Sequence, residues 1–82
     1  MNKRGFIELL QKETGRSEND CIIINDCIEQ YPIVGRKNKD KIVSLLIERL
    51  NISLEEANEI YNLSSKMILG RIKHKIIHPF SK

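Results

Sequence analysis

A chain of 82 residues is long enough for one domain with a thin core, and its 40% apolar content can fill that core. The chain has no Trp and only four aromatic residues, which argues against a deep cofactor pocket and against an aromatic platform for stacked bases. No apolar run approaches the ~18 residues of a membrane-spanning helix. The charged start of the chain does not read as a signal peptide, so we expect a cytoplasmic protein.

The two halves of the sequence repeat one pattern of apolar and capping residues. Residues 6–31 and 42–67 align without a gap, at an offset of 36 residues. The aligned pairs are Leu9 with Leu45, Leu10 with Leu46, Ser17 with Ser53, Asp20 with Glu56, Cys21 with Ala57, Ile24 with Ile60, Cys27 with Leu63 and Tyr31 with Met67. Helix starts and buried faces are independent requirements, and both recur at this offset. The pattern predicts an all-α fold: a four-helix bundle of two tandem helical hairpins with a pseudo-two-fold repeat.

The first hairpin is expected at about residues 4–32. Residues 4–13 have the apolar spacing of a short amphipathic helix, and Gly15 suits the left-handed position that follows a helix. Ser17, with an acidic residue three positions later, then starts a second helix, because its side chain caps the free amides of the first turn. Pro32 ends this helix.

A connector at residues 33–37 leads to the second hairpin, which is expected at about residues 38–78. Asn38 is the candidate cap of the first helix of this hairpin. Asn51 suits the left-handed position at the end of the same helix.

The last helix begins with the clearest cap in the sequence. Ser53-Leu54-Glu55-Glu56 is a full capping box, in which the Ser and Glu side chains each accept a hydrogen bond from the other residue's amide. The apolar stripe of this helix continues past Gly70, so the sequence predicts a long basic C-terminal helix that reaches His78. Gly70 costs ~1 kcal/mol inside a helix. The alternative is that the helix ends there, leaving Arg71–Ile77 as an extended basic segment.

Few residues are candidates for catalysis or metal binding. Cys21 and Cys27 lie six residues apart on one predicted helix, too far apart for a disulfide, and are expected to be buried apolar side chains. His74 and His78 have the spacing of half a zinc site, but Lys75 stands where zinc metalloproteases have Glu. The glycines are isolated, so the sequence contains no phosphate-binding loop. We therefore expect a protein that is not an enzyme and that needs no metal, cofactor or small-molecule ligand.

The first hairpin resembles a known family. The run from Phe6 to Ser17 is similar to the N-terminal helical hairpin of the bacterial histone-like family (HU and integration host factor), in which a helix ending in Lys-x-Thr-Gly precedes a capped helix. The resemblance covers residues 6–31. In that family the hairpins pair between two subunits, so the repeat implies the same packing within one chain. The family's DNA-bending β-ribbons have no counterpart in this sequence, so the resemblance assigns no functional residue.

Charge and apolar residues both accumulate at the C-terminus. Residues 1–65 hold nine Lys or Arg and eleven Asp or Glu, whereas residues 66–82 hold five Lys or Arg and no acid. The apolar side chains of the same segment extend past the length that the other helices can cover, which fits a homodimer or a partner helix. The leading hypothesis is a non-enzymatic protein–protein interaction module. Its expected partner-binding residues are Leu69, Arg71, Ile72, Lys73, Lys75, Ile76 and Phe80.

The alternative function is nucleic-acid binding, because a second basic cluster lies in the connector. The residues expected to contact phosphate groups are Arg36, Lys37, Lys39, Lys41, Arg71, Lys73 and Lys75. Neither cluster requires a partner, since bases at a helix end suit the helix dipole and bases in a connector are commonly solvated. Salt separates the two functions: phosphate binding weakens steeply with ionic strength, and apolar docking does not.

Overall fold

Four α-helices form the described part of the chain. The computed structural model describes residues 2–33 and 37–70. The helices are α1 (Lys3–Thr14), α2 (Glu18–Gln30), α3 (Lys39–Leu50) and α4 (Leu54–Ile68). These residues contain no β-strand, and the expected all-α class is confirmed.

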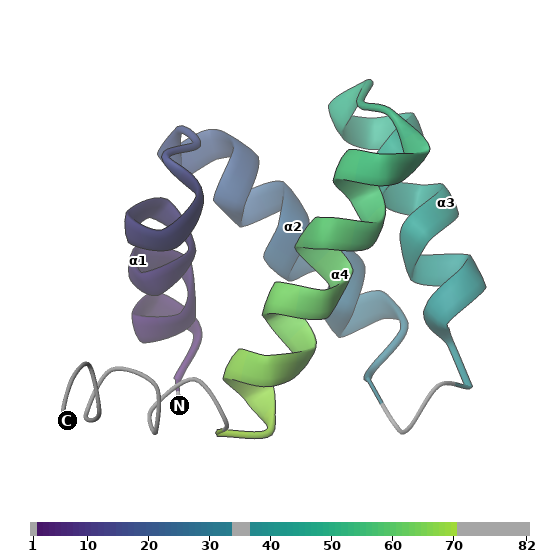
Figure 1. Cartoon of the computed structure of the whole chain (residues 1–82). Helices are drawn as coiled ribbons and strands as arrows, with labels where there is room; N and C mark the ends of the chain where they lie inside the picture. The colour runs from purple at the N-terminus through teal and green to yellow at the C-terminus, as the bar shows by residue number, and fades with distance from the viewer. Residues whose placement is uncertain (1, 34–36, 71–82) are drawn as a thin grey trace, which may run out of the picture.

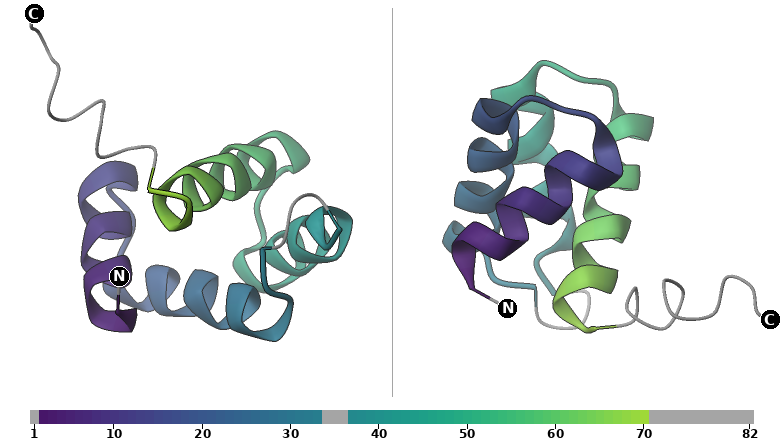
Figure 2. Two further views of the ribbon diagram at one scale, coloured as in Figure 1. Left: turned by 90° about the horizontal axis from the view of Figure 1, so that it is seen from below. Right: turned by 90° about the vertical axis from the view of Figure 1, so that its left-hand side faces the viewer.

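The helices pair into hairpins in chain order. α1 packs against α2 and α3 packs against α4, and the two helices of each pair run in opposite directions (Figure 1). α2 also packs against α3, which joins the hairpins. Seen from below, the helices follow one another around the molecule, so that α4 returns toward α1 (Figure 2). The prediction of four helices in two tandem hairpins is therefore confirmed.

The turn inside each hairpin uses the residues that the sequence indicates. Gly15 and Asn51 follow α1 and α3 with φ values of 74° and 58°, in the left-handed region. The hydroxyls of Ser17 and Ser53 each accept a hydrogen bond at 3.1 Å from the amide three residues further on. The Glu56 carboxylate accepts from the Ser53 amide at 3.4 Å, which completes the capping box. Both second helices therefore begin with a side-chain cap on one amide of the first turn.

The start of α3 differs from the expectation. Asn38 stands at the N-cap position, but its side chain makes no capping hydrogen bond. Its Nδ2 instead donates to the carbonyl oxygen of Pro32 at 2.7 Å. The side chain therefore ties the start of α3 to the end of the first hairpin across the connector.

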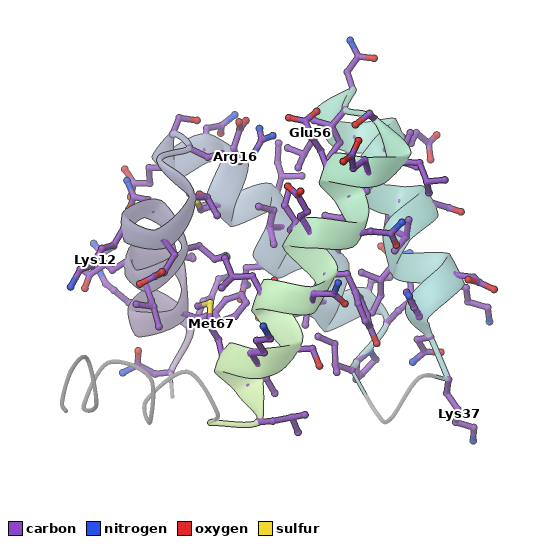
Figure 3. All side chains as sticks on the ribbon, viewed as in Figure 1. Lys12, Arg16, Lys37, Glu56 and Met67 are labelled. Carbon is purple, nitrogen blue, oxygen red and sulfur yellow. The ribbon has the colours of Figure 1, made fainter. Side chains whose placement is uncertain are left out.

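The core is built from corresponding positions of the two hairpins. Side chains from all four helices fill the space between the ribbons (Figure 3). In the first helix of each hairpin, the buried residues are Phe6, Ile7 and Leu10 in α1 and Ile42, Val43 and Leu46 in α3. In the second, they are Cys21, Ile24, Asn25, Cys27 and Ile28 in α2 and Ala57, Ile60, Tyr61, Ser64 and Met67 in α4. All three positions in the first helices and four of the five in the second helices are separated by 36 residues.

Arg16 links the two hairpins by charge. It lies in the turn between α1 and α2, and its Nη1 is 3.2 Å from an Asp20 carboxylate oxygen. Its Nη2 is 3.4 Å from a carboxylate oxygen of Glu56, at the start of α4. Arg16 and Glu56 are labelled at the same end of the molecule in Figure 3. One carboxylate thus serves both the cap of α4 and the contact between hairpins.

α4 ends earlier than the predicted long helix. Its last residue is Ile68, Leu69 is the C-cap, and Gly70 has a φ of 80°. A left-handed residue ends an α-helix, so Gly70 acts as a terminator and is not accommodated within the helix. The expected continuation to about residue 78 lies outside the described residues.

Candidate interaction surface at the end of α4

Adjacent exposed apolar side chains mark the end of α4. Ile68 is 43% exposed and Leu69 is 57% exposed. The other large apolar side chains that are exposed in the described part of the chain, Ile22 and Leu54, stand singly on α2 and at the start of α4. Single exposed apolar residues are ordinary, whereas Ile68 and Leu69 are neighbours and form one small apolar patch.

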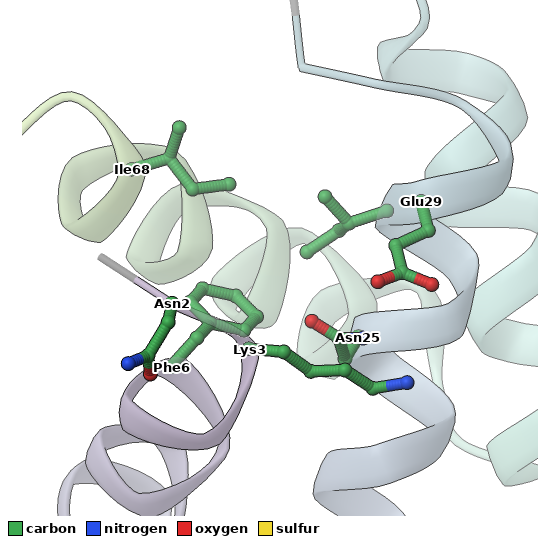
Figure 4. Close-up of a pocket in the computed structure, with 7 residues that line it drawn as sticks. Asn2, Lys3, Phe6, Asn25, Glu29 and Ile68 are labelled. Carbon is green, nitrogen blue, oxygen red and sulfur yellow. The ribbon is translucent and has the colours of Figure 1, made fainter.

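A pocket of about 330 Å³ adjoins this apolar end. The start of α1, the second half of α2 and the end of α4 enclose it (Figure 4). Its lining residues are Asn2, Lys3, Phe6, Asn25, Ile28, Glu29 and Ile68. Phe6 and Ile28 also belong to the core, so the pocket opens directly onto core side chains.

A buried amide lines this pocket. Asn25 is only 6% exposed, and its Nδ2 has no hydrogen-bond partner among the described residues. An unpaired buried donor costs about 1–3 kcal/mol. The Nδ2 is itself shielded from solvent, so this cost falls on the stability of the fold.

Side chains of opposite charge stand at the same pocket. Lys3 comes from the first turn of α1 and Glu29 from the last turn of α2, and Asn25 lies between them in the view of Figure 4. Both charged residues are exposed, and neither forms an ion pair within the part of the chain that the structure describes. The pocket thus offers an apolar wall, an amide and one charge of each sign.

The two cysteines belong to the core. Cys21 and Cys27 are fully buried, and their thiols are not bonded to each other. Burial raises the pKa of both thiols above the ordinary 9.0, and the opposing effects of Thr14 on Cys21 and of Arg49 on Cys27 are smaller. Thiols in such surroundings are poor nucleophiles and poor metal ligands. The prediction that both are buried apolar side chains is confirmed.

The described helices contain neither a cluster of metal-binding side chains nor a membrane-spanning segment. Within residues 2–33 and 37–70, no three His, Cys, Asp or Glu side chains lie close enough together to hold a metal ion. His74 and His78 lie outside these ranges. None of the helices described is long and apolar enough to cross a membrane.

The partner-binding residues expected from the sequence are only partly placed. Leu69 is described, exposed, and adjacent to a residue that lines the pocket. The other residues of the set lie outside the described part of the chain; they are Arg71, Ile72, Lys73, Lys75, Ile76 and Phe80.

Two residues of the basic cluster in the connector contact tyrosine rings. The Nζ of Lys39 lies 5.8 Å from the ring centre of Tyr61, and the Nζ of Lys41 lies 5.5 Å from that of Tyr31. Such cation–π contacts contribute about 0.5–1 kcal/mol at exposed sites. Lys37 is exposed, and the fourth base of the cluster lies outside the described residues. Two of the four bases are therefore directed toward protein rings.

Sequence reasoning missed the pocket because its residues are distant in the chain. Phe6, Asn25 and Ile68 meet only after three helices have packed. One signal was present: Asn25 interrupts an apolar run on α2, in a register that the helical period places on the buried face.

Comparison with known proteins identifies no family. A scan against protein-family models, a search of curated proteins and a search of solved structures find no match to this chain. The resemblance of the first hairpin to the histone-like family stays a prediction. Any functional conclusion therefore depends on the geometry of the site.

Proposed function

We propose that this chain is a non-enzymatic interaction module that binds another protein through the end of α4 and the segment that follows it. The binding residues of this proposal are Leu69, Arg71, Ile72, Lys73, Lys75, Ile76 and Phe80. The partner is either another protein with a complementary apolar helix or a second copy of this chain.

The adjacent exposure of Ile68 and Leu69 carries this proposal. These residues place apolar surface directly before the acid-free segment of the sequence, which contributes further Ile and Phe side chains. Burying exposed apolar surface yields about 25 cal/mol per Å², so these apolar side chains are a source of binding free energy. The basic residues of the same segment favour association with an acidic partner surface.

Nucleic-acid binding is the second candidate. Its support is the charge of residues 71–82, which hold four Lys or Arg and no acid. The described residues argue less for it, since they hold nine Lys or Arg against eleven Asp or Glu. The contacts of Lys39 and Lys41 with tyrosine rings also leave fewer connector bases for phosphate groups.

We also propose that the two hairpins are copies related by a pseudo-two-fold axis. The support is that α1 and α3 begin and end 36 residues apart, and that α2 and α4 begin at the same offset. The Ser caps and the left-handed residues recur at this offset as well. One chain would then pair two hairpins as two subunits do in the histone-like family.

Affinity capture with matched variants tests the proposed function. The bait is the full chain, used with and without nuclease treatment of an extract of the source cells. Leu69→Asp and Ile76→Asp each place a charge among the proposed binding residues. Leu54→Asp is the control, since Leu54 is equally apolar and is 61% exposed at the other end of α4. We expect the Leu54→Asp control to keep a stoichiometric protein partner, or to self-associate in sedimentation. The Leu69→Asp and Ile76→Asp variants should lose this binding.

Two results would contradict this function. Retention of the partner by Leu69→Asp and Ile76→Asp would show that the proposed binding residues do not form the binding surface. Loss of the partner on nuclease treatment would favour nucleic acid. In that case, changing Arg71, Lys73 and Lys75 together to Gln should reduce the salt slope by up to ~3, about one for each lost phosphate contact.

A further inference from the structure

The first hairpin has a pocket where the second hairpin has a tyrosine ring. Asn25 and Tyr61 are each the eighth residue of their helix, α2 and α4, and both are buried. Lys3 and Lys39 are likewise the first residues of α1 and α3. The members of each pair are 36 residues apart, the offset at which the hairpins repeat. The two hairpins therefore place different side chains at one corresponding position.

In the second hairpin, the tyrosine and the lysine contact each other. The Tyr61 ring is 3% exposed, and the Nζ of Lys39 lies over it, 5.8 Å from the ring centre. The face of an aromatic ring attracts a cation. The ring therefore lies between the core, to which it belongs, and a lysine that covers it.

In the first hairpin, the corresponding side chain carries no ring. Asn25 ends in a short amide, and the pocket of about 330 Å³ lies beside it. Lys3 lines this pocket from the start of α1 (Figure 4), as the corresponding lysine covers the tyrosine in the second hairpin. The pocket thus stands where the repeat places an aromatic side chain.

The lining of the pocket suits a ring that enters from outside. Phe6 and Ile28 are core side chains and are already buried. Ile68 is 43% exposed and Lys3 is exposed, so these side chains have surface that a ring would cover. Apolar contact with Ile68 and a cation–π contact with Lys3 would hold the ring. The Nδ2 of Asn25 takes no part, because it is shielded.

The described part of the chain has no ring to offer to the same pocket of a second copy. Phe6 and Tyr61 are buried in the core. Tyr31 is half-buried, and Lys41 lies over its ring at 5.5 Å. These contacts favour another protein as the source of the ring.

We propose that this pocket binds an aromatic side chain, Phe or Tyr, of the partner protein. Ile68 lines the pocket and the exposed Leu69 is the next residue, so one segment of the partner can contact both. The inference rests on the proposed function, since it names the kind of side chain by which the partner is recognised.

Titration of the full chain with p-cresol, the isolated side chain of Tyr, tests the pocket. Backbone amide signals in ¹H–¹⁵N spectra report the binding. We expect saturable shifts at Phe6, Ile28 and Ile68 and none at Leu54, which lies at the other end of α4. The matched probe is 4-methylcyclohexanol, which has the same substituents on a saturated ring. It should bind about two- to fivefold more weakly, because it makes no cation–π contact.

Substitutions at the pocket provide the controls. Asn25→Tyr places a ring there from α2 itself, so it should abolish p-cresol binding while circular dichroism shows an intact fold. Lys3→Gln should weaken p-cresol binding about two- to fivefold, because the cation–π contact is lost. Lys12→Gln, at an exposed position of α1 outside the pocket, should leave it unchanged. The two lysine variants decide the result even where Asn25→Tyr does not fold.

Four results would overturn the proposal. The shifts are absent or spread over all four helices, the saturated probe binds equally well, or Lys3→Gln binds p-cresol as Lys12→Gln does. The fourth is stronger p-cresol binding by Phe80→Ala, which would mean that a ring of this chain occupies the pocket.

The same titration separates the pocket from the proposed function, because p-cresol binding requires no partner. Capture of a partner through Leu69 without p-cresol binding would reject the aromatic site and leave the proposed function standing. Binding of p-cresol without any captured protein would reject the proposed function and leave the pocket as a site for aromatic rings.

Discussion

Single residues determine where the first hairpin turns. The Thr14 hydroxyl donates to the Leu10 carbonyl oxygen at 2.6 Å and accepts from the Arg16 amide at 3.1 Å. Gly15 between them adopts the left-handed conformation at φ 74°. The Thr-Gly pair of the sequence therefore ends α1 physically: Thr closes the last turn, and Gly allows the chain to reverse.

The two Ser caps should contribute equally to stability. Ser17→Ala and Ser53→Ala should each lower the free energy of unfolding by about 1 kcal/mol, because each leaves a first-turn amide without its acceptor. Chemical denaturation monitored by circular dichroism measures both. Ser44→Ala on the exposed face of α3 is the control and should raise the free energy of unfolding by about 0.5 kcal/mol, because Ala has the higher helix propensity. A silent Ser17→Ala beside a destabilising Ser53→Ala would contradict the equivalence of the hairpins.

The hydroxyl of Ser64 should lower the stability of the fold. It is fully buried, and its Oγ has no hydrogen-bond partner among the described residues. Ser64→Ala removes this unsatisfied hydroxyl and should raise the free energy of unfolding by about 1 kcal/mol. A thermal melt checks the direction of the change. A clear loss of stability would mean that the hydroxyl has a partner in solution.

At the scale of single residues, the sequence predicts contacts between residues that are close in the chain and misses contacts between distant residues. The caps at Ser17 and Ser53 join residues three apart, so the local pattern was sufficient. The contact of Arg16 with Glu56 spans 40 residues, and no local pattern indicates it. Asn38 was expected to cap its own helix, but its side chain bonds backward to the preceding hairpin.

The ends of the helices follow from backbone conformation. Asn51 ends α3 at φ 58°, the one positive φ of a non-Gly residue in the described ranges. Asn51→Gly should change stability by less than about 1 kcal/mol, whereas Asn51→Val should cost about 1–3 kcal/mol, because a β-branched residue is strained in this region. Denaturation of the two variants in parallel is the measurement. Equal stability of both would show that the turn relaxes to another conformation.

The buried faces of α2 and α4 should be equally sensitive to truncation. Ile24 and Ile60 occupy corresponding core positions at 0% and 5% exposure. Ile24→Ala and Ile60→Ala should each cost about 2–5 kcal/mol, enough to abolish folding of a marginally stable domain. Leu54→Ala, at an exposed position, should change stability by less than about 0.5 kcal/mol. A loss below that value at either core site would mean that the helix is rotated from the described face.

The apolar stripe of the sequence could not predict where α4 ends. The stripe passes through Ile68 and beyond, which favours a long helix. Ile68 is nevertheless exposed, and Gly70 is left-handed. Periodicity records which side chains share a face, whereas the end of this helix depends on the backbone freedom of one Gly.

At the scale of the whole molecule, the repeat in the sequence was sufficient to predict two hairpins. It could not predict the pocket, because Phe6, Asn25 and Ile68 belong to no common motif and meet only through packing. The same limit applies to function: the sequence indicated an apolar and basic C-terminus, and the fold adds a surface beside it. Proximity between distant segments is therefore what the structure contributes here.

Mutation of Arg16 tests how much its contact with Glu56 contributes to the packing of the two hairpins. A double-mutant cycle of Arg16→Gln and Glu56→Gln isolates their interaction, since Gln at position 56 removes the charge but still completes the capping box. We expect a coupling of about 0.2–1 kcal/mol, which salt should reduce because both side chains contact solvent. A parallel cycle with Asp20→Asn measures the pair within the first hairpin. Coupling to Asp20 without coupling to Glu56 would show that this ion pair does not help to hold the hairpins together.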